Sequence, residues 1–358
     1  MKKTKEAKVN IAGRPVLGSL THIGRGRLEK LFGMFYKNGP GRGTFLSLPF
    51  DQLVEHGAAH TFKWEKEDAI NVDITGRGAA DPRTVIELAN KGNFSAIVLH
   101  PGIVDKYQNL LRPDIPIIYK IDGHMTLPQN PPVSATIGSV KDALRLGAAA
   151  VGMSFYPGAI MTREDMIRIG RIIREAHMCG MPAVVWAYAR GPGVNEVGAD
   201  SLYWVHYACV VAESLGADVI KTKFPAPVKL EKREAYINYL KEVSKKTPEV
   251  EKYIEFEPKK GEELTKEKHT RRMELVVKAV PRTFIVVSGG PKIRGDPRKE
   301  LASITKIVMN AGAEGRIIGR NFWGVPITKG LEYAKIVAEI MRKPIYHRTF
   351  KTIEYSIS

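Results

Sequence analysis

Residues 148–191 read AAAVGMSFYPGAIMTREDMIRIGRIIREAHMCGMPAVVWAYARG, and they contain the pattern that decides the fold. Runs of small and β-branched apolar residues at 148–158 and 182–191 predict two buried strands. Between them, apolar residues spaced three and four apart predict a helix that is capped by Thr162 and ends at Gly180. A strand, a helix and a second strand in this order indicate parallel pairing of the two strands.

The same rhythm continues on both sides of this unit. Further strands are predicted at 44–52, 95–102, 115–123, 217–225, 283–290 and 315–323. Helical patterns lie between most of them, as at 139–148, 296–313 and 328–343. Eight strands with intervening helices predict a (β/α)8 TIM barrel, an α/β fold whose functional residues lie at the carboxyl ends of the strands.

Three segments fall outside the rhythm of the barrel. Residues 1–43 form a basic N-terminal extension, 226–280 form a long insertion after strand six that is rich in Lys and Glu, and 346–358 form a C-terminal tail. The catalytic barrel itself is expected at 44–345. A helix is predicted within the insertion at 229–246. We expect the extension and the insertion to cover the barrel or to form subunit contacts.

Composition limits the class of protein. The chain has 358 residues, 44% of them hydrophobic and 26% charged, as in soluble globular proteins. No apolar run is long enough for a membrane span, and the basic start has no apolar segment after it, so neither a membrane anchor nor a signal peptide is expected. With only Cys179 and Cys209, we expect a reducing, cytoplasmic location and no metal bound by cysteines.

The stretch GADVIKTKFP at 216–225 places two lysines on one face of a strand. Lys221 and Lys223 share a side with Val219, since side chains alternate along a strand. Their ammonium groups would lie roughly 7 Å apart, and their repulsion would be about 2 kcal/mol at an effective dielectric constant of about 20. This repulsion and burial both lower the pKa of Lys221, which favours a neutral amine able to form a Schiff base. Lys223 is expected to stay charged and bind an anion, although both lysines could also simply extend to solvent.

Strand five carries a second set of functional side chains. Small residues on one parity suit packing against outer helices, whereas the large residues Val184, Trp186, Tyr188 and Arg190 should face the barrel mouth. Two further charged residues are expected near them, because Lys120 lies toward the end of strand three and Asp51 ends strand one. Together these residues predict a cationic site that contains one carboxylate.

Glycine-containing turns follow strands seven and eight, the usual place of a phosphate site in barrel enzymes. Their glycines let backbone N–H groups approach an anion, and an arginine can add paired hydrogen bonds. The residues concerned are Ser288, Gly289, Gly290, Gly319 and Arg320. A phosphate site, a cationic mouth and a Schiff-base lysine together predict an aldol reaction on a phosphorylated sugar.

The motifs LPFDQLVEHG, VVWAYARG, GADVIKTK, VVSGGPK and IIGRNFW resemble those of the archaeal-type, or DhnA-type, class I fructose-bisphosphate aldolases. The resemblance implies an aldehyde-lyase of glycolysis and gluconeogenesis that interconverts fructose 1,6-bisphosphate with dihydroxyacetone phosphate and glyceraldehyde 3-phosphate. It implies Lys221 as the Schiff-base lysine, Tyr188 as the general acid/base, Asp51 as the strand-one aspartate, and Trp186 and Arg190 as substrate-binding residues. It implies phosphate binding by the two glycine turns, no metal or other cofactor, and a homo-oligomer, often a decamer.

The sequence departs from this family in one motif, because Leu53 stands where the family usually has glycine. The segments VLHPGIV and VIKT are similar to a sister family, the 2-amino-3,7-dideoxy-D-threo-hept-6-ulosonate synthases. Trp186, Lys120 and Lys223 favour the aldolase over this alternative. Tyr156, which also ends a strand, is the rival candidate for the acid/base.

Two other classes of function were weighed. A metal-dependent aldolase would need converging histidines, and His56, His60 and His100 lack a further ligand signature. The formal charge of +17 is compatible with nucleic-acid binding. However, the lysines of the extension and the insertion are interleaved with Glu, and no nucleic-acid-binding motif is present. We therefore expect a small phosphorylated substrate, and no nucleic-acid or membrane partner.

Overall fold

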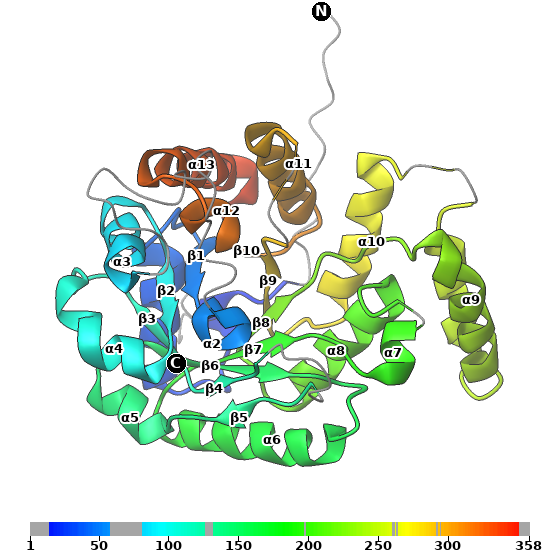
Figure 1. Ribbon diagram of the computed structural model, residues 1–358, viewed down its shortest axis with the longest axis horizontal. Helices are drawn as coiled ribbons and strands as arrows, with labels where there is room; N and C mark the ends of the chain where they lie inside the picture. The colour runs from blue at the N-terminus through cyan, green and yellow to red at the C-terminus, as the bar shows by residue number, and fades with distance from the viewer. Residues whose placement is uncertain are drawn as a thin grey trace, which may run out of the picture.

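The computed structural model describes residues 14–57, 81–125, 132–196, 198–259, 262, 264–290, 293 and 295–350. Its centre is a closed barrel of eight parallel strands in the order β1-β10-β9-β8-β7-β6-β3-β2, which confirms the predicted TIM barrel (Figure 1). The strands are β1 Phe45–Phe50, β2 Ala96–Leu99, β3 Ile117–Lys120, β6 Ala150–Phe155, β7 Ala183–Ala187, β8 Val219–Thr222, β9 Phe284–Ser288 and β10 Gly315–Ile317. A short antiparallel pair, β4 Asp122–Gly123 and β5 Ala135–Thr136, lies beside the barrel.

Helices surround the strands. The main helix after each strand is α3 Pro82–Lys91, α4 Pro101–Tyr107, α5 Val140–Arg145, α6 Thr162–Met178, α8 Leu202–Ser214, α10 Lys266–Lys278, α11 Pro297–Asn310 and α13 Ile327–Met341. Additional helices are α1 Arg25–Phe32, α2 Gln52–His56, α7 Pro192–Glu196, α9 Leu230–Ser244 and α12 Arg320–Trp323. Shorter helical turns are η1 Leu17–Ser19, η2 Gly33–Lys37, η5 Gln108–Leu110, η6 Pro248–Phe256 and η7 Pro344–Tyr346.

The start of α6 differs from its prediction. Thr162 is the first helical residue and Met161 occupies the cap position, so the expected Thr162 cap is wrong. The physical reason is that the Thr162 hydroxyl donates a hydrogen bond back to the Ala159 carbonyl, at 2.5 Å, instead of accepting one from the helix. The other end agrees with the prediction, because Gly180 has φ +63° in the left-handed region that ends helices.

The strands separate two apolar layers. On β7, Ala183, Val185 and Ala187 pack in the layer between the barrel and its helices. Val184 and Trp186 point into the barrel interior, as the alternation of the sequence predicts. The parity of this strand therefore sets which side chains can reach the mouth of the barrel.

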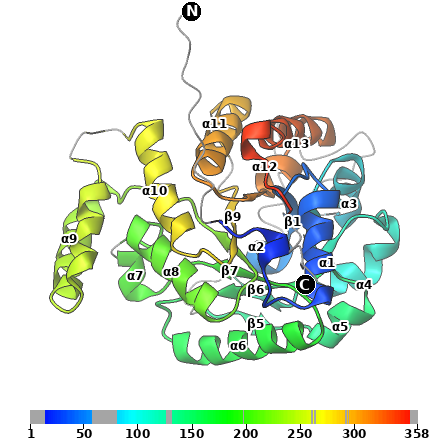
Figure 2. The same ribbon diagram turned by 180° about the vertical axis from the view of Figure 1, so that it is seen from behind.

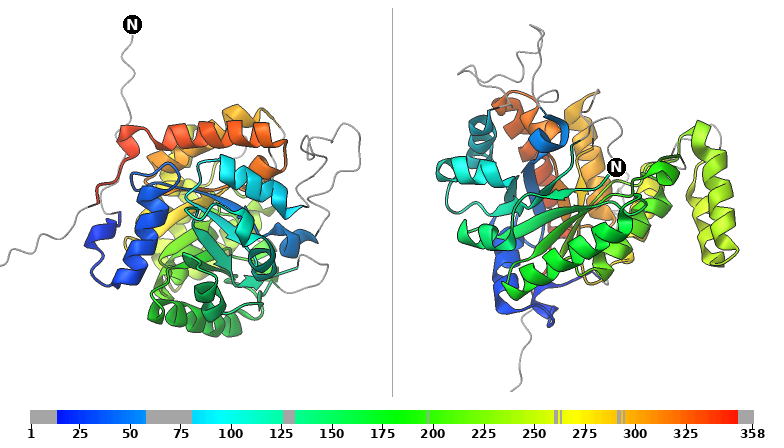
Figure 3. Two further views of the ribbon diagram at one scale, coloured as in Figure 1. Left: turned by 90° about the vertical axis from the view of Figure 1, so that its left-hand side faces the viewer. Right: turned by 60° about the horizontal axis from the view of Figure 1, so that its bottom comes forward.

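The N-terminal segment closes the end of the barrel opposite α2 (Figure 3, left). The ring of Phe35 lies 4.9 Å from that of Phe45 and 4.8 Å from that of Phe284, the first residues of β1 and β9. Two buried ion pairs hold the segment in place, Arg14 with Glu314 at 2.9 Å and Arg27 with Asp218 at 3.0 Å. The described part of the extension is therefore part of the barrel core.

The segment 226–280 contains two different parts. Helix α10 packs against α8 and α11 and is the barrel helix between β8 and β9. The predicted insertion therefore includes one helix that belongs to the barrel. Helix α9, within the predicted range 229–246, packs with η6 and lies outside the ring of barrel helices (Figure 2). A buried pair between Glu257 and Arg272, at 3.0 Å, ties this outer part to α10.

In the described part of the chain, no helix combines the length and the apolar character that crossing a membrane requires.

Candidate active site

A cavity of about 400 Å³ opens at the carboxyl ends of the strands. The predicted site residues that line it are Asp51, Trp186, Tyr188, Arg190, Lys221, Lys223, Ser288, Gly289, Gly290, Gly319 and Arg320. Other lining residues include Glu55, His56, His124, Ser154, Tyr156 and Trp323. The fold therefore brings together residues from several strand ends that are far apart in sequence.

Lys221 lies in the wall of this cavity and is 8% exposed. Its backbone is paired with that of Trp186 on β7, and its Nζ lies 4.7 Å from the centre of the indole ring and 5.9 Å from that of Tyr188. Burial lowers the pKa of Lys221 to about 8, although Asp51 opposes this effect, while the positive charge of Lys120 adds to it. A neutral amine is thus available near neutral pH.

The cause of this low pKa differs from the one predicted. Repulsion from Lys223 is the smallest of the effects on this pKa, because burial has the largest effect and Lys120 repels Lys221 more strongly than Lys223 does. Lys223 Nζ lies 3.6 Å from the Asp200 carboxylate, which also accepts a hydrogen bond of 3.0 Å from Arg190. Asp200 therefore partly neutralises Lys223 and holds two cations together at the rim of the cavity.

Lys120 was predicted to bind substrate, but it does not line the cavity. It is fully buried on β3, where its ammonium donates hydrogen bonds to the carboxylate and the carbonyl of Asp122. Its Nζ lies 5.4 Å from the ring centre of Trp186. Lys120 thus acts on the site through its charge, which lowers the pKa of Lys221.

Asp51 and Glu55 place two carboxyl groups on the same side of the cavity. Burial would raise the pKa of Asp51, but the charges of Lys221 and Lys120 outweigh it, so this pKa lies below its usual value. Burial raises the pKa of Glu55 to about 7, although Lys120, 3.8 Å away, opposes the shift. Asp51 is thus a carboxylate near neutral pH, whereas Glu55 can exchange a proton there. The sequence analysis missed Glu55, although its spacing of four from Asp51 was a signal.

Leu53 fits this arrangement without strain. It lies in α2, which continues directly from Asp51, and Arg42 is the one residue other than glycine with positive φ in the described part of the chain. The backbone at Leu53 therefore needs no glycine, and the departure from the family motif leaves Asp51 in the cavity.

Tyr188 follows the last residue of β7, and its N–H donates to the Phe155 carbonyl at 3.0 Å. Burial and the nearby Asp51 raise the pKa of its phenol well above the usual value, although a hydrogen bond with Ser288 opposes this. The ring centre lies 5.4 Å from Lys223 Nζ and 5.9 Å from Lys221 Nζ. Tyr188 therefore begins as a protonated phenol among cations, which would stabilise its phenolate once it has donated a proton.

Tyr156, the rival candidate, lines the cavity as well. Burial and Glu55 raise its pKa, while hydrogen bonds with Ser154 and Ser134 oppose the rise. Its ring centre lies 5.7 Å from that of His124. Tyr156 thus belongs to the side of the cavity near β6, and Tyr188 to the side that carries Lys223.

The turns after β9 and β10 form one structure. The side chain of Asn321 donates to the Gly289 carbonyl and that of Arg320 to the Gly290 carbonyl, both at 3.2 Å. The N–H of Gly290 points opposite to the Gly289 carbonyl of the same peptide group, and therefore away from Asn321. Since both glycines and Arg320 line the cavity, this turn can present backbone N–H and a guanidinium to an anion.

The histidines that the structure describes do not form a metal site. The His100 Nε2–H donates to the Asp122 carbonyl at 3.1 Å, and burial, helped by Lys120, lowers the pKa of His100 to about 4. His56 lines the cavity, while His60 lies outside the described residues. Across the described ranges, His, Cys, Asp and Glu side chains nowhere gather in a group of three that could hold a metal ion.

Comparison with known proteins places this geometry among aldolases. A model of the DeoC/LacD family of aldolases matches residues 45–324. The class 1 fructose-bisphosphate aldolase of Thermoproteus tenax is 29% identical over 300 residues, covering 84% of this chain and 90% of that one. The corresponding Halobacterium salinarum protein is 27% identical over 287 residues, covering 78% and 84%.

A solved structure is similar as well. An archaeal fructose-1,6-bisphosphate aldolase, with its catalytic lysine bound covalently to the carbinolamine intermediate of the substrate, superposes with a TM-score of 0.66 at 27% identity. The match covers 88% of this chain and 99% of that one.

Proposed function

Because the chain belongs to the DeoC/LacD family of aldolases, we propose that it is a class I fructose-bisphosphate aldolase. The reaction is the reversible cleavage of fructose 1,6-bisphosphate to dihydroxyacetone phosphate and glyceraldehyde 3-phosphate. The observation that carries the proposal is the buried Lys221, whose lowered pKa makes a neutral amine available in a cavity that also holds a phosphate-binding turn. This combination suits a Schiff base with a phosphorylated ketose.

Lys221 performs the first step. Its neutral amine attacks the C2 carbonyl of the substrate, a nitrogen–carbon bond forms, and one proton of the amine passes to the carbonyl oxygen, which gives a neutral carbinolamine. The Tyr188 phenol then gives its proton to the C2 hydroxyl, which leaves as water, so that an iminium ion forms on Lys221. The Asp51 carboxylate, which stays ionised near this cation, stabilises the iminium.

Tyr188 also serves the cleavage step. After it has lost its proton, its phenolate lies between Lys221 and Lys223 and can accept the proton of the C4 hydroxyl. The C3–C4 bond then breaks, its electron pair moves toward the iminium nitrogen, and glyceraldehyde 3-phosphate leaves. One residue thus acts first as an acid and then as a base, which suits a phenol with a high pKa beside cations.

The two phosphates of the substrate need two sites. The turn formed by Ser288, Gly289 and Gly290, with Arg320, suits one of them through the Gly290 N–H and a guanidinium, since the Gly289 N–H already donates to the Ile317 carbonyl. Arg190 and Lys223, held together by Asp200 at the rim, suit the other. Two cationic groups in one cavity suit a substrate that carries two phosphates.

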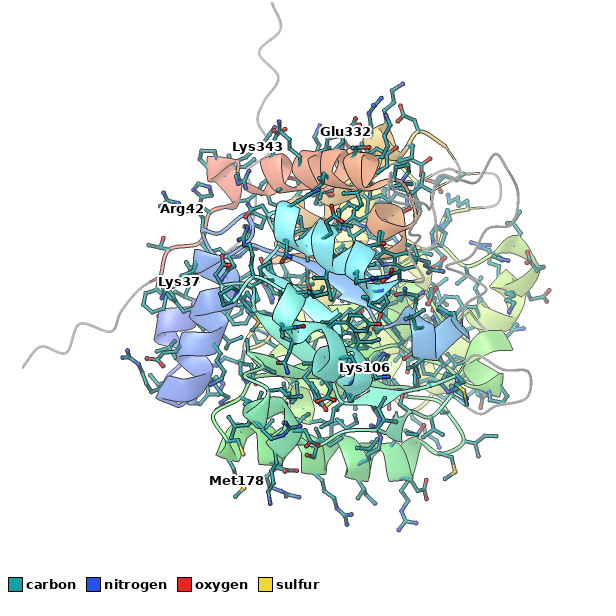
Figure 4. The ribbon with its side chains drawn as sticks, turned by 60° about the vertical axis from the view of Figure 1, so that its left-hand side comes forward. Lys37, Arg42, Lys106, Met178, Glu332 and Lys343 are labelled. Carbon is teal, nitrogen blue, oxygen red and sulfur yellow. The ribbon has the colours of Figure 1, made fainter. Side chains whose placement is uncertain are left out.

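We propose that the enzyme acts in glycolysis and gluconeogenesis, in the cytoplasm, and that it forms a homo-oligomer, as the resemblance to the archaeal-type aldolases implies. It needs no metal for the steps above, since the iminium provides the electron sink. Figure 4 shows the cations Lys37, Arg42, Lys106 and Lys343 together with the acidic Glu332 on the same face, and this mixture of charges favours a solvated surface over a nucleic-acid-binding patch.

A second substrate class shares the same chemistry. One relative, from Methanocaldococcus jannaschii, is named fructose-bisphosphate aldolase/6-deoxy-5-ketofructose 1-phosphate synthase and is 25% identical over 309 residues. Aldol transfer of this kind, or that of the aminodideoxyheptulosonate synthases, would use the same Lys221 imine. These reactions differ in the acceptor molecule that reacts with the imine, so the residues at the rim of the cavity would decide between them.

The proposal is tested by a coupled assay of fructose 1,6-bisphosphate cleavage on the purified protein, with the Lys221→Met variant as the control. We expect cleavage by the parent in the presence of a metal chelator, and none by the variant. Imine formation without cleavage of fructose 1,6-bisphosphate would favour an aldol transferase. Equal activity in both proteins would rule out the Schiff-base function.

A further inference from the structure

Arg316 differs from the other buried arginines of the described residues. Arg14, Arg27, Arg272 and Arg348 each lie within 4.0 Å of a carboxylate. Arg316 is just as deeply buried, at 1% exposure, but it makes no ion pair with a described residue. Burial alone lowers its pKa, to about 10, so its guanidinium is still charged near neutral pH. A buried charge without a partner is costly, and such groups gather at functional sites.

The place of Arg316 in the fold explains why it is buried. It is the middle residue of β10, beside Leu46 on β1 and Val287 on β9, and these two residues belong to the layer outside the barrel. Its Nη1 donates to the Thr305 hydroxyl of α11 at 3.2 Å. Its Nε, also buried, has no hydrogen-bond acceptor. Thr305 and the surrounding apolar layer therefore solvate the guanidinium only in part.

The remaining contact of Arg316 leads to the cavity. Its Nη2 donates to the carbonyl of Ser288 at 3.3 Å. The next two carbonyls, those of Gly289 and Gly290, accept from Asn321 and Arg320. Three consecutive carbonyls of the phosphate-binding turn thus each accept a hydrogen bond from a side chain of β10 or of α12, the helix after it. Each of these bonds offsets the partial negative charge of a carbonyl oxygen that would otherwise repel a phosphate.

We propose that Arg316 is a positioning residue for the phosphate site, and that a phosphate dianion at Ser288–Gly290 is the counter-charge it lacks. The guanidinium lies behind the turn and polarises it through the Ser288 carbonyl, while the phosphate binds on the cavity side. Arg316 thereby contributes to the preference for phosphorylated over unphosphorylated ketones. The inference rests on the proposed function for the identity of the ketone, but binding of phosphate itself tests it independently.

Two variants separate the charge from the hydrogen bond. Arg316→Met removes both, whereas Arg316→Gln removes the charge and keeps an amide that can donate to Ser288. Thr305→Val is the matched control, because it removes the other hydrogen-bond partner of Arg316 and leaves the charge in place. The readouts are affinity for inorganic phosphate by calorimetry, and borohydride trapping of the imine with dihydroxyacetone phosphate and with unphosphorylated dihydroxyacetone.

We expect both Arg316 variants to bind inorganic phosphate and dihydroxyacetone phosphate about tenfold more weakly than the parent. This is the loss that follows from removing one positive charge near the phosphate, partly screened by the protein between them. Trapping with dihydroxyacetone should be unchanged, and Thr305→Val should behave as the parent. Without phosphate, Arg316→Met should melt no lower than the parent, since an unpaired buried charge has been removed. Its melting temperature should rise less than that of the parent when phosphate is added.

Other outcomes would overturn the inference. Parent-like phosphate affinity in both variants would mean that Arg316 plays no part in the site. An equal loss with phosphorylated and unphosphorylated ketone, together with a lower melting temperature, would mean a purely structural residue. If the parent formed no imine with either ketone, the proposed function would fail, yet the calorimetry with inorganic phosphate would still decide the role of Arg316.

Discussion

Lys221 and Trp186 occupy paired positions on the neighbouring strands β8 and β7, and the lysine Nζ lies 4.7 Å from the indole ring centre. The Nζ of Lys120 lies 5.4 Å from the centre of the same ring. One aromatic side chain thus contacts the proposed nucleophile and the second buried ammonium group. The reactivity of Lys221 follows from this packing, because burial is the main cause of its low pKa.

The first prediction concerns pH. Because the neutral amine reacts and the pKa of Lys221 is about 8, the rate of imine formation should rise with pH and reach half its maximum near pH 8. The check is a pH profile of single-turnover imine formation with dihydroxyacetone phosphate. A rate that is flat from pH 6 to pH 10 would contradict a lysine titration in this range.

The second prediction separates the two steps assigned to Tyr188. Replacing Tyr188 by Phe removes the hydroxyl that donates and later accepts the proton, so cleavage of fructose 1,6-bisphosphate should slow by about 10²- to 10⁴-fold. Dihydroxyacetone phosphate should still form a trappable imine, more slowly than in the parent. Tyr156→Phe is the comparison, and we expect its rate of cleavage to stay within about tenfold of the parent. The reverse order of effects would transfer the role to Tyr156.

The third prediction concerns the packing under Trp186. A Cβ added at Gly152 would lie 2.7 Å from two ring atoms of Trp186, so Gly152→Ala must displace the indole. We expect a loss of about 1–3 kcal/mol of stability, as for other overpacked cores, together with slower imine formation. Gly170→Ala on α6, where a Cβ meets nothing within 4 Å, is the matched control and should leave both quantities intact or improved. Chemical denaturation and trapping kinetics measure the two effects, and an unchanged imine rate in Gly152→Ala would argue against the role of the indole.

The fourth prediction tests the N-terminal segment as part of the barrel. Arg27→Met removes one charged partner of the buried Asp218, which keeps His177 and the Ala183 N–H, so we expect a cost of about 1.5–3 kcal/mol. The pair lies at the end of the barrel opposite the cavity, so the turnover number below the melting temperature should not change. Arg25→Met on the same helix removes an exposed pair with Glu29 and should cost about 0.5 kcal/mol or less. Equal stability of the two variants, measured by denaturant unfolding, would show that the segment is only loosely attached.

The barrel could be predicted from sequence because buried parallel strands are short apolar runs with a fixed alternation. Val184, Trp186 and Tyr188 follow from that alternation alone, as do Lys221 and Lys223. Helix α10 could not be assigned to the barrel, because its Lys- and Glu-rich outer face resembles the inserted segment before it. A solvent-exposed helix face has the same Lys- and Glu-rich composition in a barrel helix as in an inserted segment.

The pairing of charged side chains could not be predicted from the sequence either. The repulsion expected from Lys223 is weakened by Asp200, which lies 23 positions earlier in the chain and becomes its neighbour only in the fold. Lys120 was expected in the cavity, yet Asp122 binds its ammonium behind Trp186. The side chain of Arg316 lies on the outer side of its strand, where strand alternation predicts contacts with helices and no functional residue. Which charges meet depends on tertiary contacts that a pattern along the chain does not contain.

The central claim is that Lys221 forms the covalent intermediate. The most direct measurement is borohydride reduction of the protein with dihydroxyacetone phosphate, followed by intact mass and peptide mapping. We predict one adduct per chain, on Lys221, and none in the Lys221→Met variant. An adduct on Lys120 or Lys223 in the parent, or a folded parent that yields no adduct, would contradict the account.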